Sequence, residues 1–535
     1  GQFGDYPSPT YFNRLKSLCQ TTLAKLDTVD QKTLSAKDTV LYRLLHGDLE
    51  VTLAGYDFPS ELLAFNQMDN RLHSYIDDSN KDLTLFPFDT VAHYDAFVSR
   101  SDGLRAYVDA QIEVLRRGIK TGVTLTKLLA ERTLPTFQEG LEPVVEKNPF
   151  WRPITFMPES FPEADKKRLK EAFRKMITER IVPSFAKFDH FFRDEYLPKC
   201  RQSGFGLSNL PQAKAWYAHL IKVHTDLTLD PDQIHETGLK EVARISAAMD
   251  KIRVQVNFKG TLKKFIQGLS TDPKYFYKSS KELFDAFLAV KEKIHSKIPQ
   301  YFNSIPKTDY TLVKSSNPED AAARYFMPTM AAPYGRFVVN SQNTAQVPMY
   351  DVTSLSLHEA VPGHHFQLAL VYEMQQTLSE YQRKMFYSGS FIEGWALYAE
   401  YLGNEMGMYE DPLQLLGNLN NDMLRAVRLV VDTGIHAKGW NREQVLAYMT
   451  EHIASDITQM SNEANRYAVM PGQALGYKLG QLKIIELRHL AEKELAAKFD
   501  LKEFHRCIIG SGTVSLAVLE SLVHEWVAAV KKTTA

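Results

Sequence analysis

The segment HEAVPGHHFQ (358–367) combines histidine and glutamate side chains in a pattern that suggests metal-dependent hydrolysis. Its first two residues match the start of H-E-x-x-H, in which two histidines one helical turn apart bind zinc and the glutamate is a general base. Four residues after His358, however, the chain has Pro362, and the next histidines are His364 and His365. A zinc site in this segment would therefore need an unusual spacing.

Regular helical geometry brings neither His364 nor His365 next to His358. Side chains six residues apart on a helix lie about 240° apart around the axis, and side chains seven apart are separated by about 10 Å along it. Pro362 cannot donate a backbone hydrogen bond and Gly363 permits unusual backbone angles, so this pair can deform a helix. We predict that Pro362-Gly363 bulges the helix and swings His364 towards His358. The alternative is that Pro362 ends a helix and leaves three surface histidines.

A carboxylate further along the chain could complete a set of metal ligands. In FIEGWALYAEYLGNEMG (391–407), Glu393 and Glu400 are seven residues apart and share one face of a predicted helix. Each of these glutamates is either a surface charge or a ligand in an apolar setting. Glu359, next to His358, would be the general base that takes a proton from the attacking water.

Two later segments carry groups that could assist hydrolysis. RLVVDTGIHAKGW (428–440) puts Asp432 four residues before His436 on one helical face, where the carboxylate could orient the imidazole. NEANRYAVMPGQALGYKLGQL (462–482) surrounds a second Pro-Gly pair with polar side chains. A phenol or imidazole near a metal can stabilise an oxyanion, and a cation can hold a substrate carboxylate. The predicted oxyanion donors are Tyr477, Tyr467 and His436, and the predicted substrate-binding residues are Arg466, Lys478, Gln473 and Asn340. For each of them alone, a structural role is the alternative.

Composition limits the classes of partner. The chain has 535 residues, a net charge of −1 and a pI near 7.1, so nucleic acid and anionic membrane surfaces are not expected as main partners. We find no run of about 18 apolar residues and therefore predict no membrane span. Cys19, Cys200 and Cys507 have no C-x-x-C spacing, which disfavours a cysteine metal site and leaves one disulfide open.

The elements that must position these residues are predicted to be mainly helices. Apolar residues at helical spacing fill 38–56, 104–119, 166–197 and 230–256. Strand-like sequence is limited to ARYFMP (323–328) and GRFVVNS (335–341), which predict a small hairpin beside the histidine helix. We predict a mainly α fold, a large helical assembly, with a helical scaffold over 1–300, a metal-site region over 301–480 and closing C-terminal helices over 481–535.

Four segments in order resemble a known bacterial family. HEAVPGHHFQ, FIEGWALYAE, RLVVDTGIHAKGW and RYAVMPGQALGYKLGQLKIIELR are similar to domain of unknown function 885 (DUF885), whose members are described as lipoproteins. That family in turn resembles the gluzincins, helical zinc peptidases with a deep cleft and a short sheet edge beside the zinc helix. The resemblance implies zinc as cofactor, with His358, His364 and Glu393 as ligands and His365 as the alternative second histidine.

The resemblance and the residues together lead to one expected function and two alternatives. We expect a zinc-dependent metallopeptidase that cleaves short peptides, with an extended substrate paired to the GRFVVNS strand. The alternatives are a metal amidohydrolase that acts on non-peptide amides and a peptide-binding protein with a vestigial metal site. The family implies the cell envelope or periplasm, with a lipid anchor if the N-terminus is processed, and the cytoplasm is the alternative location. The sequence does not indicate the oligomeric state.

Overall fold

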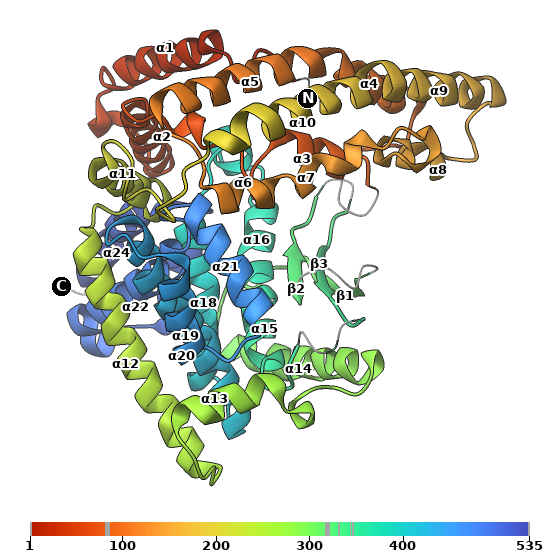
Figure 1. Ribbon diagram of the computed structural model, residues 1–535. Helices are drawn as coiled ribbons and strands as arrows, with labels where there is room; N and C mark the ends of the chain where they lie inside the picture. The colour runs from red at the N-terminus through yellow and green to blue at the C-terminus, as the bar shows by residue number, and fades with distance from the viewer. Residues whose placement is uncertain are drawn as a thin grey trace. The chain divides into compact units, whose positions relative to one another are not determined.

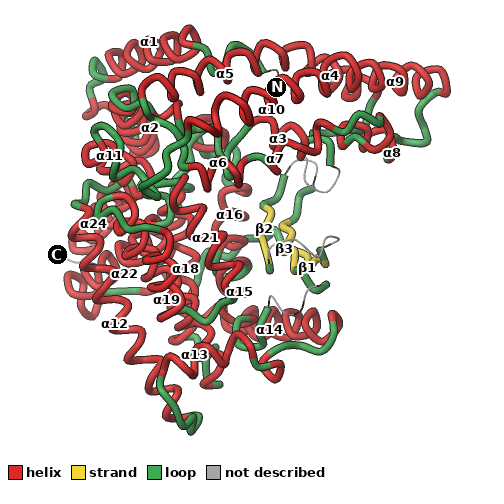
Figure 2. Tube along the Cα trace, viewed as in Figure 1, coloured by secondary structure: helices red, strands yellow, loops and turns green. Residues whose placement is uncertain are grey.

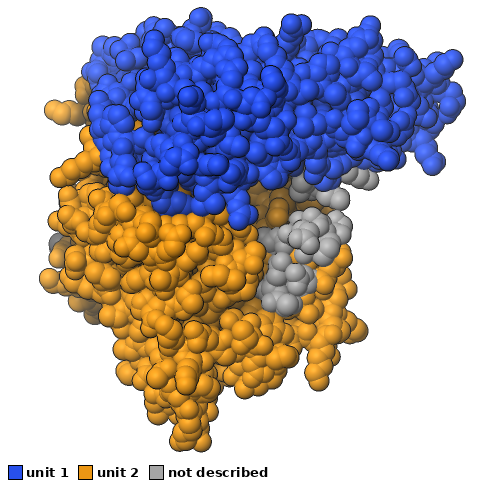
Figure 3. All heavy atoms as spheres, in the orientation of Figure 1, with its two compact units in different colours: residues 1–28, 52–213 blue, residues 29–51, 214–535 orange. Residues whose placement is uncertain are grey.

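The computed structural model describes residues 3–80, 86–315, 322–329, 332–342, 344 and 347–532. Helices make up most of the described chain, and the described strands form one small sheet (Figures 1 and 2). The prediction of a mainly α fold with a small sheet is therefore confirmed. The chain divides into two compact units, which Figure 3 colours separately: unit 1 comprises residues 1–28 and 52–213, and unit 2 comprises residues 29–51 and 214–535.

Unit 1 is built from helices around an aromatic core. Its buried rings include Phe97, Phe150 and Phe188, and the rings of Phe97 and Phe173 stack with centroids 6.0 Å apart. The stretch 166–197, which reads as one helix in the sequence, is divided by π-helical turns at Ile177–Ile181 and Phe192–Tyr196. The helices of this unit are α1 (Pro9–Leu26), α3 (Arg71–Asp77), α4 (Val91–Arg100), α5 (Leu104–Thr121), α6 (Lys127–Thr133), α7 (Pro135–Gln138), α8 (Arg152–Thr155), α9 (Glu163–Met176) and α10 (Val182–Phe191).

Unit 2 contains the sheet and the remaining helices. Helix α2 (Ala36–Gly55) begins in this unit, and its last turn, from Thr52, belongs to unit 1. The other helices are α11 (Ala213–Thr225), α12 (Pro231–Gln255), α13 (Leu262–Thr271), α14 (Ser280–Tyr301), α15 (Val352–Glu359), α16 (His364–Glu373), α17 (Glu380–Lys384), α18 (Gly389–Glu405), α19 (Pro412–His436), α20 (Arg442–His452), α21 (Ile457–Val469), α22 (Leu475–Leu495), α23 (Leu501–Ile509) and α24 (Leu516–Lys532).

The compact units do not follow the predicted boundaries at 300 and 480. Helix α12 packs along α19, and α14 packs against α15, so residues 214–300 belong with the metal-site region. At the contact between α12 and α19, a Cβ on Gly238 would lie 2.8 Å from the Leu429 side chain, so a small residue is needed there. Periodicity shows that α12 is amphipathic but does not show which later helix covers its apolar face.

The sheet of unit 2 has the strand order β1-β3-β2. Strands β2 (Ala323–Phe326) and β3 (Gly335–Val339) are antiparallel, which confirms the predicted hairpin. Strand β1 (Tyr310–Lys314), which lies outside the two strand-like segments predicted from the sequence, runs parallel to β3 on its other side. The expectation that a substrate pairs with the GRFVVNS strand is therefore wrong, because β3 is the central strand and both its edges are occupied. Within the described residues, the free edges belong to β1 and β2.

Helices α18 and α22 approach each other very closely. A Cβ on Gly394 would lie 2.5 Å from the carbonyl carbon of Gly480, and a Cβ on Gly480 would lie 2.0 Å from the Ser390 carbonyl oxygen. Cβ atoms do not reach such distances, so glycines at these positions let the two backbones come together. This contact fixes the first two turns of α18, where the candidate ligand Glu393 lies.

We expect Gly394→Ala to lower the free energy of unfolding by about 1–3 kcal/mol, because the added methyl group must push α18 away from α22. Chemical denaturation of the variant measures this loss. The matched control is Gly268→Ala in α13, where nothing lies within 4 Å of the added Cβ. Alanine is the better helix former by about 1 kcal/mol, so this control should be neutral or stabilising. Equal stability of the two variants would contradict the close contact.

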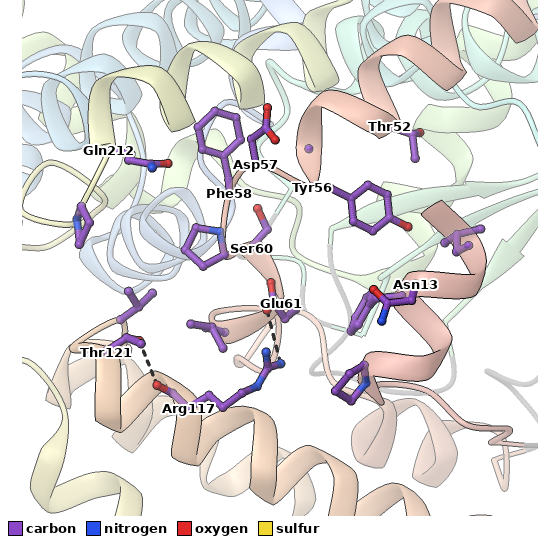
Figure 4. Close-up of a pocket in the computed structure, with 18 residues that line it drawn as sticks. Asn13, Thr52, Tyr56, Asp57, Phe58, Ser60, Glu61, Arg117, Thr121 and Gln212 are labelled. Carbon is purple, nitrogen blue, oxygen red and sulfur yellow. Dashed lines mark hydrogen bonds and ion pairs between the residues drawn. The ribbon is translucent and has the colours of Figure 1, made fainter. Parts of the chain in front are cut away.

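Unit 1 also contains a pocket of about 700 Å³, lined by α1, the end of α2, the loop that follows it and the end of α5 (Figure 4). Aromatic and apolar side chains such as Phe12, Phe58 and Leu62 form much of its wall. Its one described ion pair joins Arg117 to Glu61 at 3.4 Å, and its lining contains neither histidine nor cysteine. The pocket therefore lacks a set of groups suited to metal-dependent hydrolysis.

Two general features complete the fold. None of Cys19, Cys200 and Cys507 forms a disulfide, so the one disulfide that the sequence leaves open is not made. No helix in the described part of the chain has the length and apolar character needed to cross a bilayer.

Candidate metal centre

The chain between His358 and His364 is a break between two helices. Helix α15 ends at Glu359, the Val361–Pro362 peptide bond is cis, and α16 begins at His364. The predicted bulge within one helix is therefore wrong, although the predicted approach of the histidines is observed. Trp395 Nε1 donates a 2.8 Å hydrogen bond to the Pro362 carbonyl and fixes the turn. A Cβ on Gly363 would lie 1.9 Å from the His358 carbonyl oxygen, so this position requires glycine.

The break brings His358, His364 and Glu393 together in what we call the histidine–glutamate cluster. Glu393 Oε2 lies 3.4 Å from His358 Nε2 and 3.5 Å from His364 Nε2. The two imidazole rings have centroids 4.7 Å apart and planes 81° apart. One donor atom from each residue falls within 4.8 Å of the others, and no second such group occurs among the described residues.

The donor atoms of the cluster and two of the distances between them can be compared with those expected around a tetrahedral metal ion. Ligand atoms about 2.0–2.1 Å from a tetrahedral ion lie about 3.3 Å from one another, close to the observed 3.4 and 3.5 Å. Glu393 Oε2 is buried, and no described residue gives it a hydrogen bond of normal geometry. A buried carboxylate oxygen is costly unless a positive charge or donor satisfies it. Two imidazoles and a carboxylate that converge in this way fit a divalent metal ion.

Glu400 lies behind His358 rather than among the candidate ligands. Its Oε1 is 2.8 Å from His358 Nδ1, so the imidazole turns its Nε2 towards Glu393. Ser354 donates a hydrogen bond to the other oxygen, Oε2, of Glu400, and Asn418 Nδ2 lies 3.4 Å from the same atom. Glu400 is thus not the third ligand, the alternative that its spacing had left open. A carboxylate that orients a metal-binding imidazole is a common outer-shell arrangement.

The charges in and around the cluster shift the pKa values of both His358 and Glu393. Burial by itself would lower the pKa of His358, but Glu393 and Glu400 outweigh it and raise the pKa to about 9. Burial would raise the pKa of Glu393, yet His364 and His358 hold it well below its usual range. The carboxylate of Glu393 is therefore ionised at neutral pH, as a metal ligand must be.

We expect Glu400→Gln to weaken zinc binding by about 10–100-fold, because the amide cannot replace the charge that orients and polarises His358. Competition between the protein and a fluorescent zinc chelator measures this change. The comparison is Glu405→Gln at the exposed end of α18, where Glu405 pairs with Arg488 at 2.7 Å. Unchanged affinity in Glu400→Gln would show that the His358–Glu400 hydrogen bond does not support metal binding.

His365 points away from the cluster. Its Nδ1 lies 2.9 Å from the Tyr325 hydroxyl and its Nε2 lies 3.1 Å from the Thr308 carbonyl oxygen, so both ring nitrogens are engaged. Burial lowers the pKa of His365 to about 4, which keeps the ring neutral at physiological pH. Through these bonds His365 joins α16 to β2 and to the loop before β1. The geometry therefore favours His364 over His365 as the second histidine.

Of the predicted catalytic residues, Glu359 follows the candidate ligand His358 directly in the chain, and Tyr477 is close enough to Glu393 to be affected by its charge. Glu359 is the last residue of α15, is partly exposed, and forms no hydrogen bond or ion pair with any described residue. Tyr477 is in the first turn of α22, the helix that packs on α18. The pKa of Tyr477 is raised by burial and then by the negative charge of Glu393, so the phenol is protonated at neutral pH.

Tyr467, Arg466 and Gln473 belong to one hydrogen-bonded network, in which Arg466 and Tyr467 meet at Glu463 and Gln473 is bonded to Arg466. Arg466 donates to Gln473 Oε1 at 2.6 Å and to Glu463 at 2.9 Å, and the Tyr467 hydroxyl donates to the same glutamate. Burial would raise the pKa of Glu463, but Arg428 and Arg466 hold it well below its usual range. The Arg428 guanidinium also lies over the Tyr477 ring, 4.3 Å from its centroid. Arg466 is therefore bound within this network and is not free to hold a substrate carboxylate. Through Arg428, the same group of residues packs against Tyr477.

The other predicted site residues lie in the interior of unit 2. His436 Nε2 is 3.0 Å from the Tyr467 carbonyl oxygen, while Asp432 accepts hydrogen bonds from Tyr217 and from the Gly472 amide. Burial raises the pKa of Asp432 to about 7. These contacts give Asp432 partners that are distant in sequence, and they join α11 and the second Pro-Gly turn to α19.

Lys478 and Asn340 are also buried. Lys478 Nζ lies 2.6 Å from Asp422, 2.9 Å from Glu241 and 2.8 Å from the Gln481 side-chain oxygen, and its side chain is 1% exposed. Asn340 follows β3, and its backbone amide donates to the Ala322 carbonyl at 3.0 Å. The structure thus gives Lys478 a structural ion pair, because its charge is already matched by two carboxylates.

The fold and the cluster define the class of protein: a mainly α chain with a candidate two-histidine, one-glutamate metal centre at a broken helix. The chain belongs to the family described as bacterial protein of unknown function (DUF885), whose model matches residues 1–523. No match is found among the curated proteins.

Two solved structures are similar to this chain. One is a protein described as "the putative lipoprotein from Colwellia psychrerythraea", with 27% sequence identity and a TM-score of 0.90 over 98% of this chain and 92% of that chain. The other is described as "a putative lipoprotein of unknown function from Shewanella oneidensis", with 19% identity and a TM-score of 0.70 over 97% of this chain and 93% of that chain. Both similarities cover nearly the whole fold.

Proposed function

We propose that this protein is a zinc-dependent metallopeptidase that cleaves short peptides. The observation that carries the proposal is the convergence of two Nε2 atoms on one buried oxygen of Glu393, at 3.4 and 3.5 Å, with Glu359 as the residue that follows His358 in the chain. His358, His364 and Glu393 would hold the ion, which leaves one tetrahedral position open, as in catalytic zinc sites. When bound, zinc supplies a Lewis acid that polarises a carbonyl group.

Glu359 is suited to move the protons of the reaction. Its carboxylate follows His358 directly, is partly exposed, and is not held by any described residue. It would accept a proton from the attacking water and return that proton to the leaving amine, as a general base and then a general acid. The peptide bond is broken between its carbonyl carbon and nitrogen, and the water oxygen remains on the new carboxylate.

Tyr477 is suited to donate a hydrogen bond to the oxygen of the scissile carbonyl as negative charge develops there. A donor that is already in position stabilises this charge without reorganising during the reaction. The phenol of Tyr477 stays protonated because its pKa is raised, and the Arg428 guanidinium lies over its ring.

The outer edge of β2 is suited to bind the substrate backbone. Strand β2 contacts both α15 and α16, the two helices that carry the histidines, and among the described residues its only strand partner is β3. An extended peptide can add to such an edge through main-chain hydrogen bonds, which give affinity without sequence preference. This proposal replaces the pairing with β3 that the sequence suggested.

The similar proteins supply a proposed location. Because both solved structures are described as lipoproteins, we propose that this chain acts in the cell envelope. Peptides in that compartment would be its substrates.

The test is hydrolysis by the zinc-reconstituted protein of a mixture of peptides of four to twelve residues, followed by mass spectrometry. We expect new fragments that disappear when zinc is removed by a chelator and return when zinc is added back. Cleavage of non-peptide amides without cleavage of any peptide would favour the amidohydrolase alternative. Binding of peptides without cleavage of any amide would favour a binding protein with a vestigial site.

A further inference from the structure

The loop between α17 and α18 exposes two large apolar side chains. Met385 is 76% exposed and Tyr387 is 73% exposed, the two highest values among the large apolar side chains that the structure describes as exposed. Between them, Phe386 packs into the core of unit 2, so the loop alternates between outward and inward side chains. Large apolar groups placed together on a surface commonly mark a binding site.

The loop is held firmly at both ends. The Phe386 and Met385 amides both donate to the Tyr381 carbonyl at 2.9 Å. At the other end Ser388 caps α18 and donates to partly buried Asp226 at 2.6 Å. The exposure of Met385 and Tyr387 is therefore a property of an anchored segment rather than of an unsupported loop tip.

The Tyr387 ring lies on the same face of α18 as Glu393. A Cβ on Gly389 would lie 3.4 Å from Tyr387 Cε1 and 3.5 Å from its hydroxyl oxygen, so the ring covers Gly389. Gly389 and Glu393 are four residues apart in one helix and therefore share a face. In agreement with this position, the pKa of Tyr387 is raised, first because protein atoms around its hydroxyl displace water although the side chain as a whole is largely exposed, and then by the negative charge of Glu393. Tyr387 is thus open to solvent yet beside the candidate metal centre.

We propose that Tyr387, with Met385 beside it, forms the wall of a subsite that selects a large apolar or aromatic residue of the substrate next to the scissile bond. This inference rests on the proposed peptidase function and adds the substrate class. An aromatic ring offers a rigid surface on which a phenylalanine or leucine side chain loses its contact with water. A glycine or alanine at the same place would leave that surface exposed.

The expected size of the substrate preference follows from the apolar groups that the subsite would remove from water. One methylene group more or less in an apolar pocket changes kcat/KM by about 10–200-fold. We therefore expect peptides with phenylalanine at the selected position to be cleaved at least about tenfold more efficiently than their alanine counterparts. In Tyr387→Ala the ratio of kcat/KM for phenylalanine peptides to kcat/KM for alanine peptides should fall towards one. The main cause should be slower cleavage of the phenylalanine peptides.

The experiment measures kcat/KM for pairs of short peptides that differ only by phenylalanine or alanine on either side of the scissile bond. Tyr387→Phe keeps the ring and should keep the preference. The matched control is Tyr401→Ala, which changes a second exposed tyrosine, this one within α18, and should behave as the wild type. Absence of any preference in the wild type, or an unchanged preference in Tyr387→Ala, would overturn the subsite while the cleavage itself upholds the peptidase.

A binding measurement separates failure of the subsite from failure of the proposed function. Calorimetric titration of the same peptides into zinc-loaded Glu359→Gln needs no turnover. If the wild type cleaves nothing but this variant binds the phenylalanine peptides more tightly, and adding Tyr387→Ala removes the difference, the subsite stands and the peptidase fails. If there is neither cleavage nor preferential binding, both fail.

Discussion

Replacing Glu359 by glutamine is expected to lower kcat for peptide hydrolysis by about 10²–10⁴-fold, the contribution of a positioned general base. The amide has nearly the same shape as the carboxylate but cannot accept a proton from the attacking water. Because Glu359 is partly exposed and bonded to no described residue, the substitution should leave the fold unchanged. Steady-state kinetics on the zinc-reconstituted variant measures the loss.

Two controls make this result specific. Metal content should stay at the wild-type level, because Glu359 is not one of the three residues that converge on the candidate metal position. Glu373→Gln, at the exposed last residue of α16, should retain wild-type activity, since its carboxylate accepts a hydrogen bond from the Thr308 amide and Glu373 is not part of the cluster. Wild-type turnover by Glu359→Gln would remove this residue from the mechanism.

The second large effect is loss of metal binding in His364→Ala. Removal of a direct ligand should weaken zinc binding by more than the 10–100-fold that typically follows loss of an outer-shell group. The remaining His358 and Glu393 would form only two of the three protein ligands that a catalytic zinc site uses. Equilibrium dialysis at buffered zinc concentrations, with metal measured by mass spectrometry, gives the affinity.

His365→Ala is the matched comparison, because it deletes the same side chain at the adjacent position. It removes hydrogen bonds to Tyr325 and to the Thr308 carbonyl, so we expect a loss of stability of about 1–3 kcal/mol with zinc affinity retained. Metal loss in His365→Ala together with retention in His364→Ala would reverse the assignment of the second histidine.

The sequence predicts which residues come close together better than it predicts the local backbone structure that brings them together. His358 and His364 are brought together at Pro362-Gly363, as the helix-breaking character of this pair predicts. Whether the pair bulges a helix or ends it depends on the surroundings, here Trp395, whose indole donates to the Pro362 carbonyl from α18. No local pattern contains that contact.

The two glutamates of α18 illustrate the same limit. A spacing of seven predicts that Glu393 and Glu400 share a face, and both do reach His358. Which glutamate lies at Nε2 of the imidazole and which lies at Nδ1 depends on where α18 crosses α15. The partners of Glu400, Ser354 and Asn418, come from α15 and α19 and leave no signal in the segment around it. The role of Glu400 therefore required the structure.

Polar residues around the second Pro-Gly pair were the least predictable. Lys478 looks like a substrate anchor in the sequence, but its charge is matched by Glu241 and Asp422, which are distant in the chain. Tyr387 lies outside every motif that the sequence suggested, and only its exposure beside Glu393 singles it out. Long-range charge pairing and solvent exposure are properties of the folded chain, and local patterns do not report them.

The most direct test of the central claim is anomalous diffraction at the zinc absorption edge from crystals grown with zinc. We expect one strong peak bounded by His358 Nε2, His364 Nε2 and a Glu393 carboxylate oxygen, at about 2.0–2.2 Å from each. His365 and Glu400 should keep their present hydrogen bonds. A peak at other donors, or a filled zinc position anywhere else with none at this cluster, would contradict the account.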